Sequence, residues 1–261
     1  MFVYFKKYQG AGNDFVMIDN FSGQYDDLSV SQIQSLCDRR FGIGADGLIK
    51  INKSAAADFY VDYYNSDGSQ SFCGNGARCS VRFVNEEILK EKSQYSFDAI
   101  DGLHEGEVLS YAEIRIQMTN VERIEIIKDN HYLLDTGSPH YIVFTENIDE
   151  LDLKKEGQKI RYSDRFNEKG VNVNFIELLK EGELRIRTYE RGVEDETLAC
   201  GTGITAAALA HLHLTNKEGM VKVHARGGEL SVKAFRNSQG FGDVELIGPA
   251  TFVFDGKMEC A

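Results

Sequence analysis

FCGNGARCSVRF at residues 72–83 and ACGTGITAAALA at residues 199–210 are the stretches that decide the fold. Each contains a Cys-Gly-X-Gly turn, and each continues as small and apolar residues with helical spacing. The turn cysteines, Cys73 and Cys200, are 127 residues apart. A matched pair of this kind indicates an internal repeat in which each copy contributes one helix that opens from a cysteine.

The same offset of 127 residues recurs in two further places. Asn13 in GNDFVMI lies over His140 in SPHYIVF, and Gly47 in ADGLIKI lies over Asn174 in VNFIELL. Three separate registers therefore agree on one repeat length. We predict two structurally similar halves, each built around one helix.

Strand-like runs outnumber helical ones, and this mixture predicts an α+β fold. Helical spacing is clearest at 29–39, 76–90 and 203–214. We expect residues 1–120 to form the N-terminal half and 121–251 the C-terminal half. The strand-like runs lie at residues 2–8, 15–19, 48–52, 59–64, 113–118, 131–135, 141–145, 173–179, 184–189, 220–224 and 229–235.

Charge and hydropathy exclude several classes of function. The chain has 41 acidic against 29 basic residues and a formal charge of −12, which disfavours nucleic acid and anionic lipid as partners. No run of 18 apolar residues occurs, and the first residues lack a signal-peptide pattern, so we expect no membrane association and a cytoplasmic protein. Five cysteines, an odd number, indicate free thiols rather than a disulfide framework.

The two Cys-Gly-X-Gly turns carry the strongest chemical signal. A cysteine at a helix start lies at the positive end of the helix dipole, which favours the thiolate, and the glycine N–H groups beside it can bind a carboxylate. A lone cysteine is more often a small buried hydrophobe, but two turns in register favour chemistry. One thiolate could remove a proton from a carbon while a thiol returns one on the other side, which inverts the centre without a cofactor.

Polar residues precede each turn. Glu190 and Arg191 lie shortly before Cys200, and Asn65 lies shortly before Cys73. Taken alone, Glu-Arg is usually a surface ion pair and Asn-Ser-Asp-Gly a turn. Their similar placement before the two thiols favours an amino-acid site, in which Glu190 accepts from an ammonium and Arg191 binds a carboxylate.

Other kinds of site are disfavoured. The G-x-G-x-x-G match at residues 42–47 follows a helical segment and precedes a strand, the reverse of a dinucleotide site. The cysteine and histidine spacings do not match a zinc site, and neither a P-loop nor a G-x-S-x-G motif occurs. We therefore expect no metal and no cofactor.

The residues together resemble the diaminopimelate epimerase family, cofactor-independent isomerases that convert LL-diaminopimelate to the meso form on the bacterial route to lysine and cell-wall peptide. The segments span most of the chain in the family's order. The matching segments are GAGNDF at 10–15, NSDGS at 65–69, CGNGARC at 73–79, SPH at 138–140, NVNF at 172–175, ERG at 190–192 and ACGTG at 199–203.

The resemblance implies two pseudo-twofold-related halves, each a curved, mostly antiparallel sheet around a central helix, with the active site between them. A last strand at about 252–261 would join the N-terminal half. Cys73 and Cys200 correspond to the acid/base pair, and His140 borders the site. The residues that correspond to substrate contacts are Asn13, Asn65, Gly74, Asn75, Asn172, Glu190, Arg191, Gly201 and Thr202.

Two departures from the family pattern bear on substrate identity. Gly47 stands where many members have a glutamine that helps to bind substrate, and Ser138 stands where many have asparagine. The resemblance implies an amino-acid substrate. Epimerisation of diaminopimelate is therefore weighed against racemisation of another amino acid on the same fold, and against non-catalytic amino-acid binding, for which two thiols would be unnecessary. A homodimer is left open.

Overall fold

The computed structural model describes residues 1–260, which form two compact units. The first unit contains residues 1–116 together with the chain from Gly248 onward, and the second is Gln117–Ile247. The chain thus divides a few residues before the expected positions 120 and 251. No helix within residues 1–260 is long and apolar enough to cross a membrane.

The first unit is a mixed sheet of eight strands. In the order β17-β1-β2-β3-β4-β5-β6-β7, neighbouring strands pair antiparallel except for β2 with β3 and β4 with β5, which are parallel. The strands are β1 Phe2–Gly10, β2 Asn13–Asp19, β3 Gly47–Asn52, β4 Phe59–Asn65, β5 Gln94–Ala99, β6 Gly102–Val108, β7 Glu113–Gln117 and β17 Thr251–Glu259.

The second unit repeats this topology. In the order β8-β9-β10-β11-β12-β14-β15-β16, the same two steps are parallel, β10 with β11 and β12 with β14, and a short β13 pairs with β12. The strands are β8 Ile124–Lys128, β9 His131–Asp135, β10 Pro139–Phe144, β11 Asn172–Lys180, β12 Glu183–Glu190, β13 Asp195–Thr197, β14 Gly219–Ala225, β15 Gly228–Arg236 and β16 Phe241–Pro249.

The registers of the two sheets match the repeat in the sequence. Phe15 pairs with Gly47 between β2 and β3, and Ile142 pairs with Asn174 between β10 and β11, so both partners shift by the same 127 residues. The predicted α+β fold with two similar halves is confirmed.

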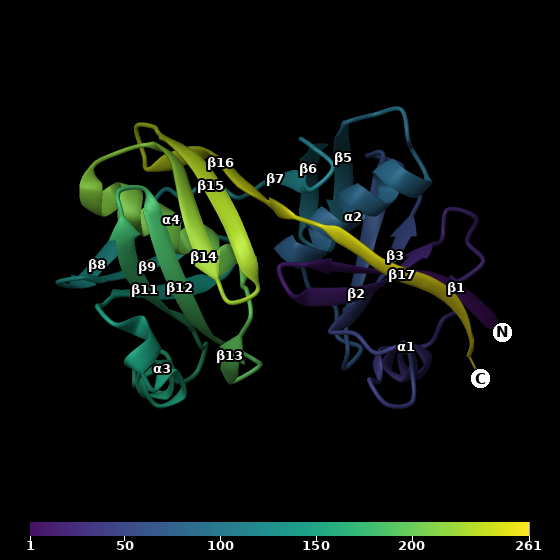
Figure 1. Ribbon diagram of the computed structural model, residues 1–261, viewed down its shortest axis with the longest axis horizontal. Coiled ribbons are helices and arrows are strands. Elements are labelled where there is room, and N and C mark those ends of the chain that lie inside the picture. Colours follow the sequence, from purple (N-terminus) through teal and green to yellow (C-terminus); the bar gives the residue numbers. More distant parts are fainter. Residues whose placement is uncertain (261) are drawn as a thin grey trace. The chain divides into compact units, whose positions relative to one another are not determined.

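A single buried helix lies against the sheet of each unit (Figure 1). Helix α2, Gly74–Glu87, contacts β1, β2, β3, β4 and β6, and α4, Gly201–Thr215, contacts β9, β10, β11, β12, β14 and β15. Eleven of the 15 residues of α4 are buried, which its alanine run permits because small side chains let strands approach on several sides. Both helices start two residues earlier than expected, directly after Cys73 and Cys200.

Two surface helices connect parallel strands. Helix α1, Val30–Cys37, joins β2 to β3 and is closed at its start by a capping box between Ser29 and Gln32. Helix α3, Leu153–Arg161, follows a short 3-10 turn, η1 at Ile148–Glu150, and joins β10 to β11. The sequence did not predict α3, because LKKEGQKIR is mostly charged and only Leu153 and Gly157 are buried.

Candidate functional site

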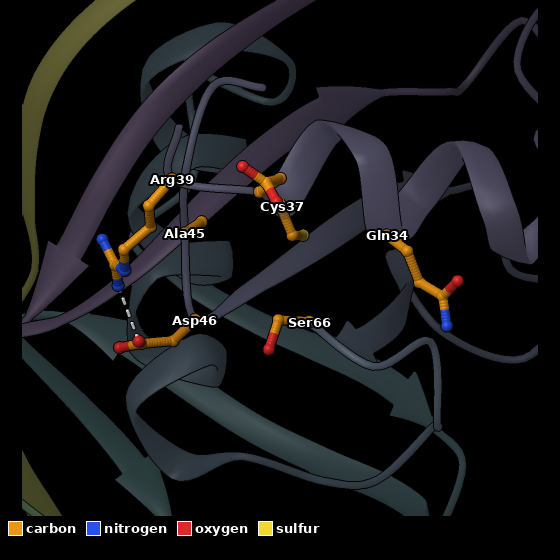
Figure 2. A pocket seen from close by; sticks show the side chains of 7 residues that line it. Gln34, Cys37, Arg39, Ala45, Asp46 and Ser66 are labelled. Atoms are coloured by element: carbon orange, nitrogen blue, oxygen red, sulfur yellow. Dashed lines mark hydrogen bonds and ion pairs between the residues drawn. The ribbon is translucent and has the colours of Figure 1, made fainter. Parts of the chain in front are cut away.

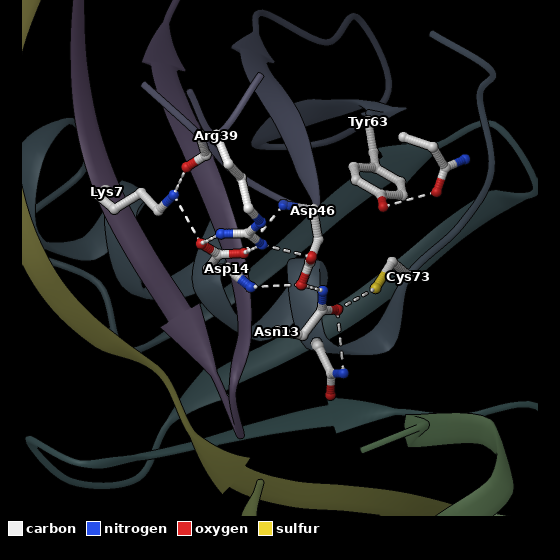
Figure 3. A network of polar contacts seen from close by, with 10 residues as sticks. Lys7, Asn13, Asp14, Arg39, Asp46, Tyr63 and Cys73 are labelled. Atoms are coloured by element: carbon white, nitrogen blue, oxygen red, sulfur yellow. Dashed lines mark hydrogen bonds and ion pairs between the residues drawn. The ribbon is translucent and has the colours of Figure 1, made fainter. Parts of the chain in front are cut away.

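Cys73 lies at the start of α2, where it is the N-cap residue and its side chain is half-buried. Its sulfur lies 3.5 Å from Oδ1 of Asn13, at the beginning of β2 (Figure 3). Gly74 and Asn75 follow in the first turn of the helix, and both are buried. The β2 strand and the helix start therefore bring together three of the predicted site residues in the first unit.

The amide of Asn13 has a fixed orientation. Its Nδ2 donates to Oδ2 of Asp46 over 2.7 Å, so its Oδ1 faces both the Cys73 sulfur and Nδ2 of Asn75, which is 3.3 Å away. Asn75 is held in turn by the buried Arg78, whose Nη2 donates to Asn75 Oδ1 over 2.8 Å. The acceptor that meets the Cys73 sulfur is thus set by charged groups behind it.

An ion-pair network supports Asp46 (Figure 3). Arg39 bridges Asp46 and Asp14, each over 2.7 Å, and the buried Lys7 lies 2.8 Å from Asp14. Burial acts to raise the pKa of the Asp14 carboxyl, but hydrogen bonds from Arg39 and Lys7 outweigh it and hold that pKa well below its usual value. Asp14 therefore stays ionised and keeps the network closed.

A hollow of about 420 Å³ opens beside this network (Figure 2). Arg39, whose side chain is 57% exposed, and Asp46 lie on its wall. The Arg39 end of the network therefore faces the hollow, whereas Lys7 is buried. The remaining lining residues are Gln34, Cys37, Asp38, Ala45 and Ser66.

Asn65, at the end of β4, is oriented by its neighbours. The hydroxyl of Tyr63 donates to Asn65 Oδ1 over 2.8 Å, and Asn65 Nδ2 donates to the backbone and hydroxyl oxygens of Ser69 and to Ser71 Oγ, each over 3.1 Å. Gly47 pairs with Asn65 in the β3–β4 ladder. In the other unit the ladder partner of Asn174 is Thr188, so Glu190 lies two residues beyond the position equivalent to Asn65, and the expected symmetry of these two polar residues is only approximate.

Gly47 leaves room for a neighbouring aromatic ring. A Cβ atom at this position would lie 2.4 Å from Cε2 of Tyr63 and 2.5 Å from the carbonyl oxygen of Tyr64. The ring of Tyr63 is buried and packs edge-on against Phe15 with centroids 5.7 Å apart. Tyr63 therefore occupies the space that a side chain at position 47 would need.

Introducing a side chain at Gly47 is expected to destabilise the protein. The substitution Gly47→Ala forces Tyr63 or the β4 backbone to move, and overpacking of this kind costs about 1–3 kcal/mol. Urea unfolding measured by circular dichroism gives the change in the free energy of unfolding. A variant as stable as the wild type would contradict the packing described for Tyr63.

Cys200 occupies the corresponding place in the second unit, as the half-buried N-cap residue of α4. Its sulfur lies 3.4 Å from Oγ1 of Thr202, and that hydroxyl lies 2.9 Å from Nε2 of His140. Ser138 joins the cluster, with its Oγ 3.0 Å from the same nitrogen of His140. The structure thus brings together four predicted residues around the second cysteine.

His140 is held below the start of α4. It is fully buried, and Nδ2 of Asn174 lies 3.0 Å from its Nδ1. Burial, assisted by the charge of Arg191, lowers the pKa of His140 to about 3, so the imidazole is neutral at physiological pH. Gly203 makes this packing feasible, because a Cβ atom there would lie 2.5 Å from Asn174 Oδ1.

Acid is expected to destabilise the protein through His140. Below its ordinary pKa of 6.5 the unfolded chain binds a proton that the folded chain rejects, so stability present above pH 6.5 is lost as pH falls toward 3. Between pH 6.5 and 4.5 this loss is about 2–3 kcal/mol. Urea unfolding at both pH values should show a smaller pH dependence in His140→Gln than in the wild type. Equal dependences would contradict the burial of a neutral imidazole.

Asn172 and Arg191 are linked at the ends of β11 and β12. The backbone N–H of Arg191 donates to Asn172 Oδ1 over 2.9 Å, and the Arg191 guanidinium donates to the carbonyl oxygen of Lys169 over 3.0 Å. Gly170, with a φ of +74°, lets the arginine stem lie against the chain, since a Cβ atom there would be 2.4 Å from Arg191 Cδ. Arg191 is exposed and Glu190 is half-buried, so both are accessible to a ligand.

The three other cysteines lie in different surroundings. Cys37, Cys79 and Cys260 are buried. Burial raises the pKa of Cys37 and of Cys79 to about 12, so these thiols remain protonated. Within residues 1–260, no three His, Cys, Asp or Glu side chains group closely enough to hold a metal ion.

Three residues with clear roles in these clusters were missing from the sequence prediction. Asp46 lies inside the G-x-G-x-x-G match, where attention to the glycines concealed the carboxylate that orients Asn13. Asn174 was visible in the repeat as the counterpart of Gly47, but its contact with His140 requires the parallel pairing of β10 with β11. Tyr63 gave no signal beyond a strand pattern.

The chain matches known proteins over nearly its full length. The family model described as diaminopimelate epimerase matches residues 5–124 and 132–253. A diaminopimelate epimerase of Flavobacterium psychrophilum is 48% identical over 95% of this chain and 97% of that protein, and one of Chlorobaculum tepidum is 41% identical over 95% and 98%.

Solved structures with the same fold are more distant in sequence. A PhzF-family phenazine biosynthesis protein of Bacillus anthracis superposes with a TM-score of 0.79 at 13% identity, covering 99% of both chains. A hydroxyproline epimerase of Agrobacterium vitis superposes with a TM-score of 0.71 at 12% identity, covering 98% of this chain and 91% of that one. These likenesses concern the fold, whereas the sequence matches confirm the resemblance seen in the motifs: the chain belongs to the diaminopimelate epimerase family.

Proposed function

We propose that this protein converts LL-diaminopimelate to meso-diaminopimelate without a cofactor, as a step in the synthesis of lysine and peptidoglycan precursors. The observation that carries the proposal is the pair of half-buried cysteines, Cys73 and Cys200, each at the start of the buried helix of its unit. Curated relatives that share 41–48% of aligned residues over nearly the whole chain bear the name of this activity.

The reaction proceeds by two proton transfers at one carbon. One cysteine thiolate takes the α-proton of the substrate, the electron pair remains on the carbon and its carboxylate, and the other cysteine thiol protonates the carbon from the opposite face. Backbone N–H groups of Gly74, Asn75, Gly201 and Thr202, at the two helix starts, bind the carboxylate at the reacting carbon and stabilise its developing charge. Neither transfer requires a redox step.

The remaining polar residues recognise the substrate. Arg191 binds the distal carboxylate through its planar guanidinium, and Glu190 accepts from an ammonium group. The side-chain amides of Asn13, Asn65 and Asn172 supply further polar contacts. The exposure of Arg191 and the anchoring of its guanidinium on the Lys169 carbonyl support this role, because the side chain is held in place yet reachable.

Racemisation of a different amino acid is the second candidate. The packing of Tyr63 over Gly47 favours it, because a side chain with substrate contacts in many family members is here replaced by a ring. Ser138, in place of an asparagine, points to the same end of the problem. A shorter substrate would not need Arg191.

We also infer a cytoplasmic location. All five cysteines are free thiols in the structure, and two-thiol chemistry needs both active sulfurs reduced. Reducing compartments maintain such thiols, whereas oxidising ones favour disulfides.

Incubation with LL-diaminopimelate in deuterium oxide tests the function directly. Proton NMR should show loss of the α-proton signal together with formation of the meso isomer, resolved by chiral chromatography. L-proline and L-alanine serve as comparison substrates. Exchange of either at the rate of diaminopimelate would favour the second candidate, and no exchange with any amino acid would contradict a racemase or epimerase function.

A further inference from the structure

Each site cysteine lies at the end of a chain of hydrogen bonds whose direction is fixed. Backbone N–H groups and guanidinium groups can only donate, and backbone carbonyls and ionised carboxylates can only accept. These groups determine which end of each asparagine amide faces its neighbours. From there the direction of each bond follows residue by residue to the two sulfurs.

In the second unit the chain begins at Asn174. Its Nδ2 lies 3.4 Å from the carbonyl oxygens of both Tyr141 and Asn172, which accept, so this end of the amide carries the protons. The same Nδ2 therefore donates to Nδ1 of His140 over 3.0 Å. Because His140 is neutral, its one ring proton lies on Nε2 and is directed to the hydroxyls of Thr202 and Ser138.

Ser138 has little capacity left to accept. The N–H of Arg191 fixes Asn172 Oδ1, so Asn172 Nδ2 donates to Ser138 Oγ over 3.1 Å, and His140 Nε2–H is also within 3.0 Å of that oxygen. With its two lone pairs engaged, the Ser138 hydroxyl donates toward Thr202, 3.4 Å away. The Thr202 hydroxyl accepts on this side, and its own proton is directed to the Cys200 sulfur, 3.4 Å away.

In the first unit the direction is reversed. The ionised Asp46 accepts from Asn13 Nδ2, and Arg78 donates to Asn75 Oδ1, so Asn75 Nδ2 donates to Asn13 Oδ1. The Cys73 sulfur, 3.5 Å from Asn13 Oδ1, thus meets an oxygen that can only accept. This contact stabilises the S–H form of Cys73, whereas a donated proton stabilises a thiolate at Cys200.

From these directions we infer that Cys200 is the thiolate base and Cys73 the thiol acid in the substrate-free protein, with Thr202, His140 and Asn174 as positioning residues for Cys200. The inference rests on the proposed two-thiol function and deepens it. Two charges bear on the balance. Arg191 acts on the His140 side and favours a thiolate, and so does Arg78 near Cys73, but Arg78 donates to the oxygens of Asn75, Gly74 and Pro249.

The assignment fixes the order of proton movement. Cys200 takes the α-proton and becomes S–H, the electron pair of the broken C–H bond stays on the substrate, and Cys73 gives its proton to the carbon and becomes a thiolate. Product therefore leaves the protein in the opposite protonation state. Proton exchange with water must restore the starting state before the same stereoisomer reacts again.

Alkylation of the two cysteines tests the assignment. The reduced, full-length protein is treated with limiting iodoacetamide at pH 7 without substrate, and peptide mass spectrometry gives the rate at each cysteine. Since the thiolate is the nucleophile, Cys200 should react at least about tenfold faster than Cys73, which corresponds to one pKa unit or about 1.4 kcal/mol. An equal or faster rate at Cys73 would overturn the assignment.

Variants separate the hydrogen bond from simple access to the sulfur. Thr202→Val keeps the shape but loses the donor, so the rate at Cys200 should fall about tenfold while that at Cys73 is unchanged, and Thr202→Ser should restore it. Thr136→Val is the matched control, because the Thr136 hydroxyl donates to the Thr202 carbonyl over 2.9 Å and not to sulfur. Equal rates at Cys200 in the wild type and Thr202→Val would also overturn the inference.

The outcome is distinguishable from failure of the proposed function. Alkylation reports the protonation of the sulfurs without any substrate. If diaminopimelate shows no exchange in deuterium oxide but Cys200 reacts selectively through Thr202, the function fails and the assignment of protonation states stands. If exchange occurs without selectivity, the reverse holds.

Discussion

Replacement of either Cys73 or Cys200 by alanine is expected to lower kcat/KM for LL-diaminopimelate by at least about 10²–10⁴-fold, the range typical of one acid or base group. Each substitution deletes one of the two proton carriers, and the remaining thiol cannot complete the inversion alone. Both side chains are only half-buried, so the folded structure should persist. Activity is measured by chiral separation of the stereoisomers, and folding by circular dichroism.

The matched control is Cys79→Ala, in the same helix as Cys73. The Cys79 thiol is completely buried and its pKa is raised to about 12, so it has no part in proton transfer. This variant should lose some stability through the cavity it creates, but should keep its turnover. Wild-type turnover by Cys73→Ala or Cys200→Ala would remove that cysteine from the mechanism.

The repeat could be predicted from the sequence because both copies need the same small residues at the same close contacts. Gly76 and Gly203 each follow a cysteine by three residues, and a Cβ atom at either would press on side chains of the neighbouring strands, at 3.0 Å from Ile49 and 2.5 Å from Asn174. Such contacts tolerate little change, so the motif survives where most of the surrounding sequence has diverged. Strand register then followed from the offset alone.

Elements with little apolar patterning were missed. Strand β6, GLHEGEV, has one buried residue and pairs through its backbone, which no side-chain period reports. The same holds for α3, whose charged surface hides its two buried positions. Strand β17 closes the first unit beside β1 from the far end of the chain, a pairing that only the folded structure displays.

Site residues were predictable where their chemistry is carried by residue type, and not where it depends on orientation. Cysteines at helix starts declare themselves in a sequence. The amide directions of Asn13 and Asn174 do not, because each is set by a partner distant in the chain, Asp46 for the first and backbone carbonyls for the second. The sequence therefore predicted which residues surround the thiols but not which thiol receives a proton.

Substitution of Arg191 by methionine is expected to weaken turnover of diaminopimelate steeply. A guanidinium bound to the distal carboxylate makes a charge-assisted contact, and leaving that carboxylate without its partner costs about 2–5 kcal/mol, or roughly thirty- to several-thousand-fold in kcat/KM. The fold should be preserved, because Arg191 is exposed and its backbone N–H, which holds Asn172, remains in the variant. Initial rates over a range of substrate concentrations give the effect on kcat/KM.

The matched control is Arg226→Met, an exposed arginine of the same unit whose guanidinium pairs with Glu196 over 3.0 Å. Surface ion pairs of this kind contribute about 0–1 kcal/mol to stability, so this variant should retain nearly full turnover. Amino acids that lack a distal carboxylate give a second comparison, since they should be poor substrates of the wild type and insensitive to Arg191→Met. If the substitution lowered turnover of alanine and diaminopimelate by the same factor, Arg191 would act on the fold or the reacting centre rather than on the distal carboxylate, and the racemase alternative would be favoured.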